Sequence, residues 1–382
     1  MSLTDKVTNY LKQLPGFHTS RRIIVFESDD WGSIRMPSVE VYNRFVEKGF
    51  NMSDGVSARY NKYDSLATYE DLQDLFEVLS SVKDFKGNHC VMTPMCLVAN
   101  PDFDKIEESG FKEYFYEPFT ETLKKYPGCE KSFELWKEGI SSGIFVPQFH
   151  GREHLNISRW LEALIAGDKN AHLAFKYKFW GYPKQFNSGK PEKSFQAAFD
   201  FSNYSEIKVL DKIIEDGLKI FSQLFGYDAT CFTPPNGPLS RLNEKISAKN
   251  GIKYIQTARM IYNEPVGMGK TRKRIRYLGK RNKYNQVYLT RNCFFEPSEC
   301  AKFNWVDKCL VDIDTAFKYN KPAIISSHRV NYIGALDSKN RDEGLNQLSL
   351  LLKRVIKIYP DIEFLTSSQL GESIIGNGFK ET

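Results

Sequence analysis

The sequence predicts an α/β barrel built on a parallel sheet. Short β-type runs alternate with amphipathic helical segments along the 382 residues, and this alternation is typical of parallel sheets and barrels. Five of the runs end abruptly in polar, ionisable residues, and barrel enzymes place their chemistry at the carboxyl ends of the strands. The chain is 41% hydrophobic and 14% aromatic, which supports a large core and excludes a disordered or fibrous protein.

The expected strands and helices follow from the spacing of apolar residues. Strands followed by polar clusters are expected at 22–27, 144–149, 229–232, 286–290 (continuing to Glu296) and 323–327. Further strands are expected at 89–98, 252–256 and 362–365. Helical periodicity predicts helices over 68–79, 205–224, 305–317 and 344–358.

The chain contains no repeat and no linker rich in Pro, Gly or Ser. We therefore expect one domain over 1–382 with its core at about 20–375 and a short helix over 3–14 packed outside. Insertions are expected near 41–85, 101–140, 169–203 and 262–285. The third, rich in aromatic residues and lysine, fits neither a helix nor a strand and is expected to be a loop.

The positive charge is concentrated in one segment. Eight cations and no acid lie between Lys270 and Lys283, and removing these eight charges from the total of +6 leaves −2 for the rest. A nucleic-acid-binding protein usually spreads its basic residues over a whole face, so no nucleic-acid partner is expected. The segment instead predicts a solvated hairpin or a clamp for phosphate or an anionic sugar.

The sequence also predicts the compartment. No apolar run approaches 18 residues, so no transmembrane segment is expected, and the first residues lack the apolar stretch of a secretory signal. The seven cysteines are scattered without a C-x-x-C pair, which indicates reduced thiols. We therefore expect a cytoplasmic protein.

A metal site is predicted at the barrel rim. His150 and His154 follow a strand and are four residues apart, a spacing that directs both imidazoles the same way. A divalent ion needs a third, anionic ligand, and the pair Asp29-Asp30 offers one carboxylate as a ligand and another as a base. Taken separately, the histidines could simply be hydrogen-bonded and the aspartates could cap a helix.

These motifs in this order resemble those of one family. An Asp-Asp turn, H-x-x-x-H, a Pro-Pro turn ending in Gly237 and a late strand ending in His328 are arranged as in the polysaccharide deacetylases, the carbohydrate esterases similar to nodulation protein B. Residues 364–370 look like the family's closing segment, so the resemblance spans about 23–370. It implies a distorted (β/α) barrel of about seven strands with a metal at its mouth.

The resemblance also implies roles for individual residues. It assigns three metal ligands: Asp30, His150 and His154. Asp29 matches the general base that takes a proton from the attacking water, and His328 matches the general acid that protonates the leaving group. The backbone N–H near Asn236 matches a donor to the tetrahedral oxyanion.

The sequence departs from the family pattern at several positions. The family's arginine that contacts the catalytic aspartate is replaced by Thr233, and Arg152 or Arg329 is the expected substitute. Glu296 is the expected partner of His328, because the family's Asp-x-x-Asp-Trp motif is missing. Gly151 replaces the family's Ser or Thr after the first histidine, and Asn236 replaces an aromatic residue. Trp31, inserted beside the aspartates, is expected to lie in the site and stack on sugar.

The predicted function is metal-dependent removal of an acetyl group, as N-acetyl, from a carbohydrate. Zinc is the expected divalent ion, and a lipid- or nucleotide-linked, hence phosphate-linked, sugar would suit a protein without an export signal. One alternative is a carbohydrate-binding barrel that is non-catalytic or of glycosidase type, the latter with Asp29 and Glu296 as facing carboxylates. Another is a zinc protease of the H-x-x-E-H type with Glu153 as the base, which requires a continuous helix through both histidines. Oligomeric state is not indicated.

Overall fold

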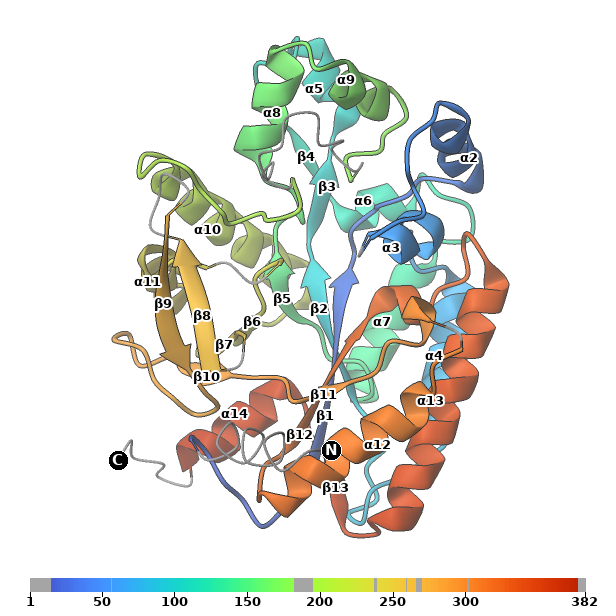
Figure 1. The fold of residues 1–382 in the computed structure, drawn as a ribbon, viewed down its shortest axis with the longest axis vertical. Helices are drawn as coiled ribbons and strands as arrows, with labels where there is room; N and C mark the ends of the chain where they lie inside the picture. Colours follow the sequence, from blue (N-terminus) through green and yellow to red (C-terminus); the bar gives the residue numbers. More distant parts are fainter. Residues whose placement is uncertain are drawn as a thin grey trace.

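The computed structural model describes residues 15–55, 57–181, 195–236, 239–258, 260–265, 270–300 and 302–376. Its centre is a nine-stranded sheet in the order β10-β7-β6-β5-β2-β1-β12-β11, with β13 also paired to β1. Every pair in this sheet is parallel, and helices surround it (Figure 1). The prediction of a barrel-like α/β fold on a parallel sheet is confirmed.

Most strands fall close to the expected runs and several are shorter, but β1 continues beyond the expected 22–27 to Trp31 and β5 begins only at Gln148, not at 144. The sheet consists of β1 (Arg22–Trp31), β2 (Met92–Leu97), β5 (Gln148–Gly151), β6 (Cys231–Phe232), β7 (Tyr254–Gln256), β10 (Val287–Leu289), β11 (Cys293–Phe294), β12 (Ala323–His328) and β13 (Ile362–Phe364). Two antiparallel hairpins lie outside it: β3 (Ala99–Pro101) with β4 (Tyr116–Pro118), and β8 (Met260–Pro265) with β9 (Thr271–Arg276).

The sheet is curled into an incompletely closed barrel. Its edge strands β10 and β11 are joined by residues 290–292 alone, a link that spans at most about 14 Å from Leu289 to Cys293. In the described part of the chain these two strands are not paired with each other. Parallel strands that lie side by side need a much longer crossover, so β10 and β11 follow each other along one extended run that pairs first with β7 and then with β12.

Both faces of β1 are buried, as in most parallel sheets. Ile23 and Val25 pack with apolar residues of β7, β10 and β12, which come from both halves of the sheet, so this cluster fills the barrel interior. Ile24 and Phe26 belong to the larger cluster under the outer helices. This two-sided burial explains why β1 appears in the sequence as a continuous apolar run.

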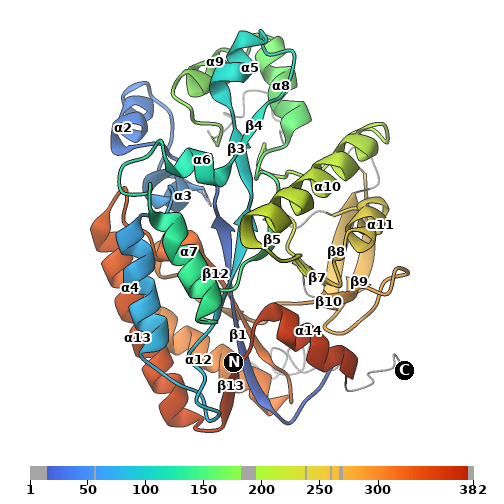
Figure 2. The ribbon, with the colours of Figure 1, turned by 180° about the vertical axis from the view of Figure 1, so that it is seen from behind.

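The outer helices flank the sheet on both sides (Figures 1 and 2). They are α4 (Tyr69–Ser80), α7 (Ser132–Ser141), α10 (Glu206–Phe225), α11 (Arg241–Lys249), α12 (Trp305–Lys318), α13 (Ser338–Ile358) and α14 (Ser367–Gly376). The four helices predicted from periodicity are confirmed. Helix α13 begins six residues before the expected start, because its first turn is polar and Asp337 caps it through Lys339 N. Helices α4 and α7 lie within segments expected to be insertions, yet they contribute Leu72 and Trp136 to the main core.

A second group of short helices lies beyond the carboxyl ends of the strands. It comprises α2 (Val39–Glu47), α3 (Ala58–Tyr63), α5 (Phe103–Glu108), α6 (Phe119–Leu123), α8 (Ile157–Ile165), α9 (Lys169–Lys176) and the 3-10 turns η1 (Pro297–Glu299) and η2 (Arg329–Asn331). Several of them share an apolar cluster around Trp160 and Phe175.

The predicted loop over 169–203 is wrong at its start. Helix α9 forms there because the Asp168 carboxylate accepts hydrogen bonds from Asn170 N and Ala171 N. Residues 182–194 of that expected loop, and the expected helix over 3–14, lie outside the described residues. Within the part of the chain that is described, no helix has the combination of length and apolar character needed to cross a bilayer.

Candidate metal centre and acid–base site

The polar residues singled out in the sequence meet in one cavity. A cavity of about 880 Å³ opens at the carboxyl ends of β1, β5, β6 and β12. Its lining includes Asp29, Asp30, His150, His154, Asn236 and His328. The structure therefore brings together six residues that are spread over 300 positions of the chain.

A bulge at the end of β1 turns two adjacent carboxylates toward this cavity. The register between β1 and β2 shifts between Ser28 and Trp31, and Asp30 has a φ of 75°. In a regular strand successive side chains face opposite sides, whereas a bulge redirects one of them. Asp29 and Asp30 consequently both line the cavity.

The same bulge places Trp31 in the core, so its predicted place in the site is wrong. Its side chain is only 1% exposed and packs edge-on against Trp136 and Phe145. Its indole N–H donates to Ser28 Oγ at 2.9 Å. The ring therefore has no surface to offer a sugar.

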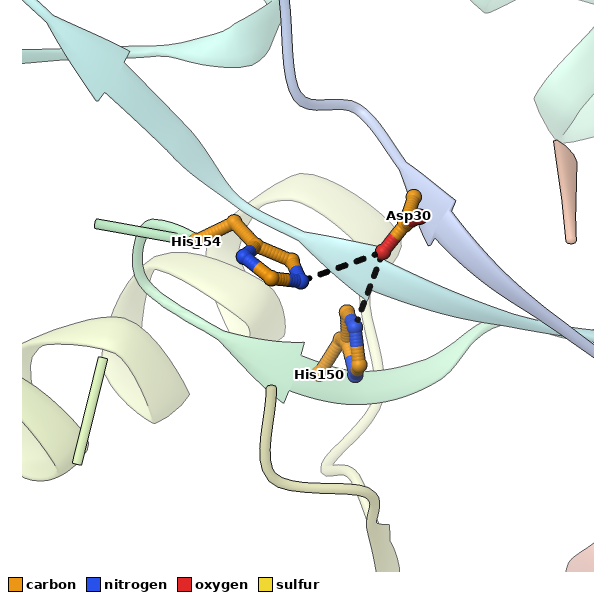
Figure 3. A group of neighbouring side chains, drawn as sticks. All are labelled: Asp30, His150 and His154. Carbon is orange, nitrogen blue, oxygen red and sulfur yellow. Dashed lines mark hydrogen bonds and ion pairs between the residues drawn. The ribbon is translucent and has the colours of Figure 1, made fainter. Parts of the chain in front are cut away.

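Asp30, His150 and His154 have the geometry of a shared metal site. The Nε2 atoms of His150 and His154 lie 3.3 and 3.4 Å from the same oxygen, Asp30 Oδ1 (Figure 3). The three candidate ligand atoms all lie within 4.8 Å of one another. Ligand atoms bound at about 2.1 Å to one tetrahedral ion would be about 3.4 Å apart. The three side chains therefore fit a divalent cation.

The main chain just after β6 fixes the orientation of His150. His150 Nδ1 lies 2.6 Å from the carbonyl oxygen of Thr233. A carbonyl only accepts, so Nδ1–H donates, and Nε2 is the nitrogen available to a metal. The ring of His154 lies parallel to that of Trp180, with centroids 6.1 Å apart. Burial alone would raise the pKa of Asp30, but the two imidazoles hold it well below its ordinary value.

The carboxylate of Asp29 is held by an arginine that sequence reasoning missed. Arg291 donates from Nη1 to Asp29 Oδ2 and from Nη2 to Asp29 Oδ1, both at 2.6 Å, and from Nε to Glu27 Oε2 at 2.6 Å. It thus lies between two carboxylates that are two residues apart on one face of β1. Burial alone would raise the pKa of Asp29, but Arg291, with smaller contributions from His150 and His328, lowers it.

Arg152 and Arg329, the predicted substitutes for the family's arginine, do not contact Asp29, and neither lines the cavity. Arg152 pairs with Glu153 and Asp216. Arg329 is fully buried, donating to Asp64 Oδ1 and to the carbonyl of Ser33. The sequence signals the need for such a cation, because Glu27 lies in a buried strand, but Arg291, Arg152 and Arg329 all follow strands and are equal candidates.

His328 is bound by the predicted partner. Its Nδ1 lies 2.6 Å from Glu296 Oε1, while Glu296 Oε2 accepts from Arg59 Nη1 at 2.7 Å and Asn331 Nδ2 at 2.9 Å. His328 Nε2 lies 3.9 Å from Asp29 Oδ2. Burial lowers the pKa of His328, but the charge and hydrogen bond of Glu296 outweigh this and raise it to about 9. The imidazole is therefore protonated at neutral pH.

Asn236 lines the cavity on the side of β6 and has a φ of 52°. Asparagine is one of the few residues with a side chain that adopts this left-handed backbone readily. Since the next residue described is Leu239, the contribution of this turn to an oxyanion stays a prediction.

The H-x-x-E-H protease alternative requires a helix that the structure lacks. Strand β5 ends at Gly151, which has a φ of 146°, and α8 begins only at Ile157. Glu153 is buried, accepts a hydrogen bond from Arg152 at 2.7 Å and is not part of the cavity lining. This interpretation of the histidine pair is wrong.

The basic segment Lys270–Lys283 contains β9 and forms the predicted hairpin with β8. Arg276 is buried in its middle and donates to Glu244 Oε1 at 2.7 Å and to Thr257 Oγ1 at 3.2 Å. Thr257 also lines the main cavity, whereas Lys280 and Lys283 line a separate cavity of about 160 Å³. The hairpin is therefore adjacent to the site through Thr257.

No protein-family model matches the chain, and no curated protein matches it. Among solved structures it is similar to a protein from Mycobacterium smegmatis provisionally assigned as a polysaccharide deacetylase (11% identity, 96% of this chain and 94% of that one, TM-score 0.43). Another is a provisionally assigned glycoside hydrolase/deacetylase from Parabacteroides distasonis (9%, 96% and 74%, TM-score 0.49). A third is described as a pseudoenzyme of the CE4 family from Bacillus anthracis (8%, 93% and 66%, TM-score 0.38). Polysaccharide deacetylases thus occur among its structural neighbours, at low sequence identity.

Proposed function

We propose that this protein is a metal-dependent hydrolase that removes an acetyl group, as N-acetyl, from a carbohydrate. One observation carries the proposal: a three-residue group with the spacing of a metal site lies beside an arginine-held carboxylate and a carboxylate-held histidine. A divalent cation, with zinc expected, would acidify water and polarise the amide carbonyl there. The remaining chemistry belongs to the side chains.

Asp29 is placed to act as the base. Its two oxygens accept from Arg291, but a carboxylate has about four acceptor positions, so it can still receive a proton from water. Because Arg291 holds its pKa low, Asp29 is a weak base and can deprotonate only an acidified water. The base thus depends on the neighbouring metal site.

His328 is placed to act as the acid. It is protonated at neutral pH, with Nδ1–H donating to Glu296, and it lines the cavity. An amine leaves a tetrahedral intermediate only when it is protonated. Nε2–H can supply that proton, while Glu296 stabilises the charged imidazole before transfer.

The glycosidase alternative is disfavoured by the position of Glu296. A glycosidase needs two carboxyl groups that face each other across the sugar. Glu296 is buried behind His328, is engaged by Arg59, and is not among the cavity-lining residues.

The proposal also includes a phosphate-linked sugar as the substrate, on the basis of the basic hairpin. It includes a cytoplasmic location, on the basis of the cysteine pattern.

Elemental analysis combined with acetate release tests this function. We expect about one divalent ion per chain and release of acetate from acetylated sugars or oligosaccharides, lost on chelation and restored by zinc. Bound metal without acetate release from a panel of N- and O-acetylated sugars would make the chain a binding protein. Absence of bound metal would remove the proposal altogether.

A further inference from the structure

Arg35 is a buried cation in the wall of the main cavity that has no partner for two of its donors. It lies in the loop after β1, lines the cavity, and is 6% exposed. Its Nε and Nη2 are buried and make no hydrogen bond. The guanidinium lies 5.1 Å above the ring of Tyr60, which also lines the cavity.

The carboxylates near Arg35 are engaged elsewhere. Among the described residues, none accepts a hydrogen bond from Nε or Nη2 of Arg35. Asp64 attracts it from farther away, but Asp64 Oδ1 already accepts from Arg329 at 3.0 and 2.8 Å. Asp30 also attracts it, but that carboxylate contacts the two histidines.

Two other arginines in this part of the molecule, Arg291 and Arg329, are matched by carboxylates. Arg291 makes three hydrogen bonds to the carboxylates of Glu27 and Asp29, and Arg329 pairs with Asp64. A buried charge without a partner lowers stability, and an arginine stays charged even so. A divalent ion at Asp30 would add positive charge to the same cavity and increase the imbalance.

We propose that Arg35 binds an anionic group of the substrate, a carboxylate or a phosphate carried by the acetylated sugar. The proposal rests on the proposed function and deepens it by naming the substrate class. The two unmatched N–H groups, Nε and Nη2, lie on one edge of the guanidinium, which matches two oxygens of a carboxylate or phosphate. Because the arginine stem has several rotatable bonds, that edge can turn toward the cavity.

Binding of matched sugars tests the proposal without relying on turnover. The probes are N-acetylglucosamine, its C6-oxidised form 2-acetamido-2-deoxyglucuronic acid, and N-acetylglucosamine 1-phosphate, titrated calorimetrically into the full chain. We expect at least one anionic probe to bind the wild-type protein about tenfold or more tightly than the neutral sugar. The probe that binds more tightly identifies the anionic group as a carboxylate or a phosphate. Equal binding of all three probes would overturn the proposal.

Variants of Arg35 assign the preference to this residue. In Arg35→Met, which keeps most of the side-chain length, we expect the anionic preference to fall by about ten- to a hundred-fold, with a much smaller change in binding of the neutral sugar. Arg35→Lys keeps the positive charge but lacks the paired N–H groups of the guanidinium, so it should retain part of the anionic preference. A preference that survives in Arg35→Met would place the anion elsewhere, for instance on the basic hairpin.

Thermal unfolding separates binding from a structural role. Arg35→Met should melt at the same temperature as wild type or higher, because an uncompensated buried charge is removed. The matched control Arg329→Met should melt clearly lower, since it leaves Asp64 buried and unpaired. A large destabilisation in Arg35→Met would show that Arg35 is structural.

The two proposals can fail separately. Acetate release from neutral sugars without an anionic preference would overturn this inference alone, whereas an anionic preference without acetate release would overturn only the proposed function.

Discussion

The two ends of strand β1 carry charged residues in different arrangements. At the amino end, Arg21 donates to both oxygens of Glu363 at 2.7 and 2.5 Å, and Lys86 donates to the same carboxylate at 2.7 Å. These charges are matched, and both cations are partly exposed. At the carboxyl end, Asp30 has a left-handed backbone and its carboxylate lies beside two imidazoles, and Arg35 has unmatched donors.

The difference shows where the barrel is optimised for stability and where for chemistry. Strained backbone and incompletely matched buried charge reduce stability and are found mainly at functional sites. The amino face of a barrel is instead the end at which residues contribute chiefly to stability. Substitutions at the two ends should therefore affect different properties.

The largest effect is expected from Asp30→Asn. Losing the anionic ligand should remove bound metal and reduce acetate release by about a thousand-fold or more. Elemental analysis and an acetate assay measure these two losses. The matched control, Glu363→Gln at the amino end of β1, should keep its metal. If Asp30→Asn also keeps its metal, the proposed difference between the two ends of β1 is wrong.

Arg291→Met should be the exception that sharpens the comparison. It leaves Glu27 and Asp29 buried without their cation, which should cost about 3–5 kcal/mol of unfolding free energy. Urea denaturation measures this loss. If Arg291→Met unfolds like the wild-type protein, Arg291 orients Asp29 without stabilising the fold. The charged residues at the carboxyl end of β1 would then all serve the site.

The pH dependence of His328 tests its pairing with Glu296. Its pKa in the folded chain is raised to about 9, above the value of about 6.5 expected when unfolded. This pairing therefore stabilises the fold fully below pH 6.5, and the contribution is lost as the pH rises through about 9. NMR titration of the imidazole in metal-free protein should show this pKa, and Glu296→Gln should lower it. If the pKa of His328 is unchanged in Glu296→Gln, a group other than Glu296 raises it.

The smallest effect is expected from Glu363→Gln at the amino end. The hydrogen bond from Arg21 lowers the pKa of Glu363 to about 2, although burial opposes this shift. The stabilisation is therefore present above about pH 4.5 and is lost as the pH falls toward 2. Because Arg21 and Lys86 are 38% and 49% exposed, we expect only about 1 kcal/mol at pH 7. Urea unfolding at pH 7 and pH 3 measures it, and equal losses at both would contradict the ionic origin.

The fold and the metal group were predictable because their signals are local. A strand buried on both faces is a continuous apolar run, and the ionisable residues Asp29, His150 and His328 lie at or near the carboxyl ends of β1, β5 and β12. The four-residue spacing of His150 and His154 required no knowledge of the rest of the chain.

The errors concern residues whose position depends on distant partners. Trp31 lies next to Asp30 at the end of β1, and only the bulge against β2 decides which of them faces the cavity. Arg291 contacts Asp29 across 262 residues, whereas Arg152 and Arg329 are as polar and as close to strand ends. Local sequence contains nothing that ranks these three arginines, and the choice depends on which buried carboxylate each one reaches.

The pairing of β1 with β12 and β13 also has a consequence for the order of folding. Asp29 is in register with His328, so the edge of β1 that pairs with β12 finds its partner only about 300 residues later. Contacts this distant in the chain form slowly, and an unpaired apolar strand edge is prone to aggregation. During synthesis, β1 must therefore wait with one edge exposed until the last quarter of the chain arrives, and the acid and base meet only in that late step.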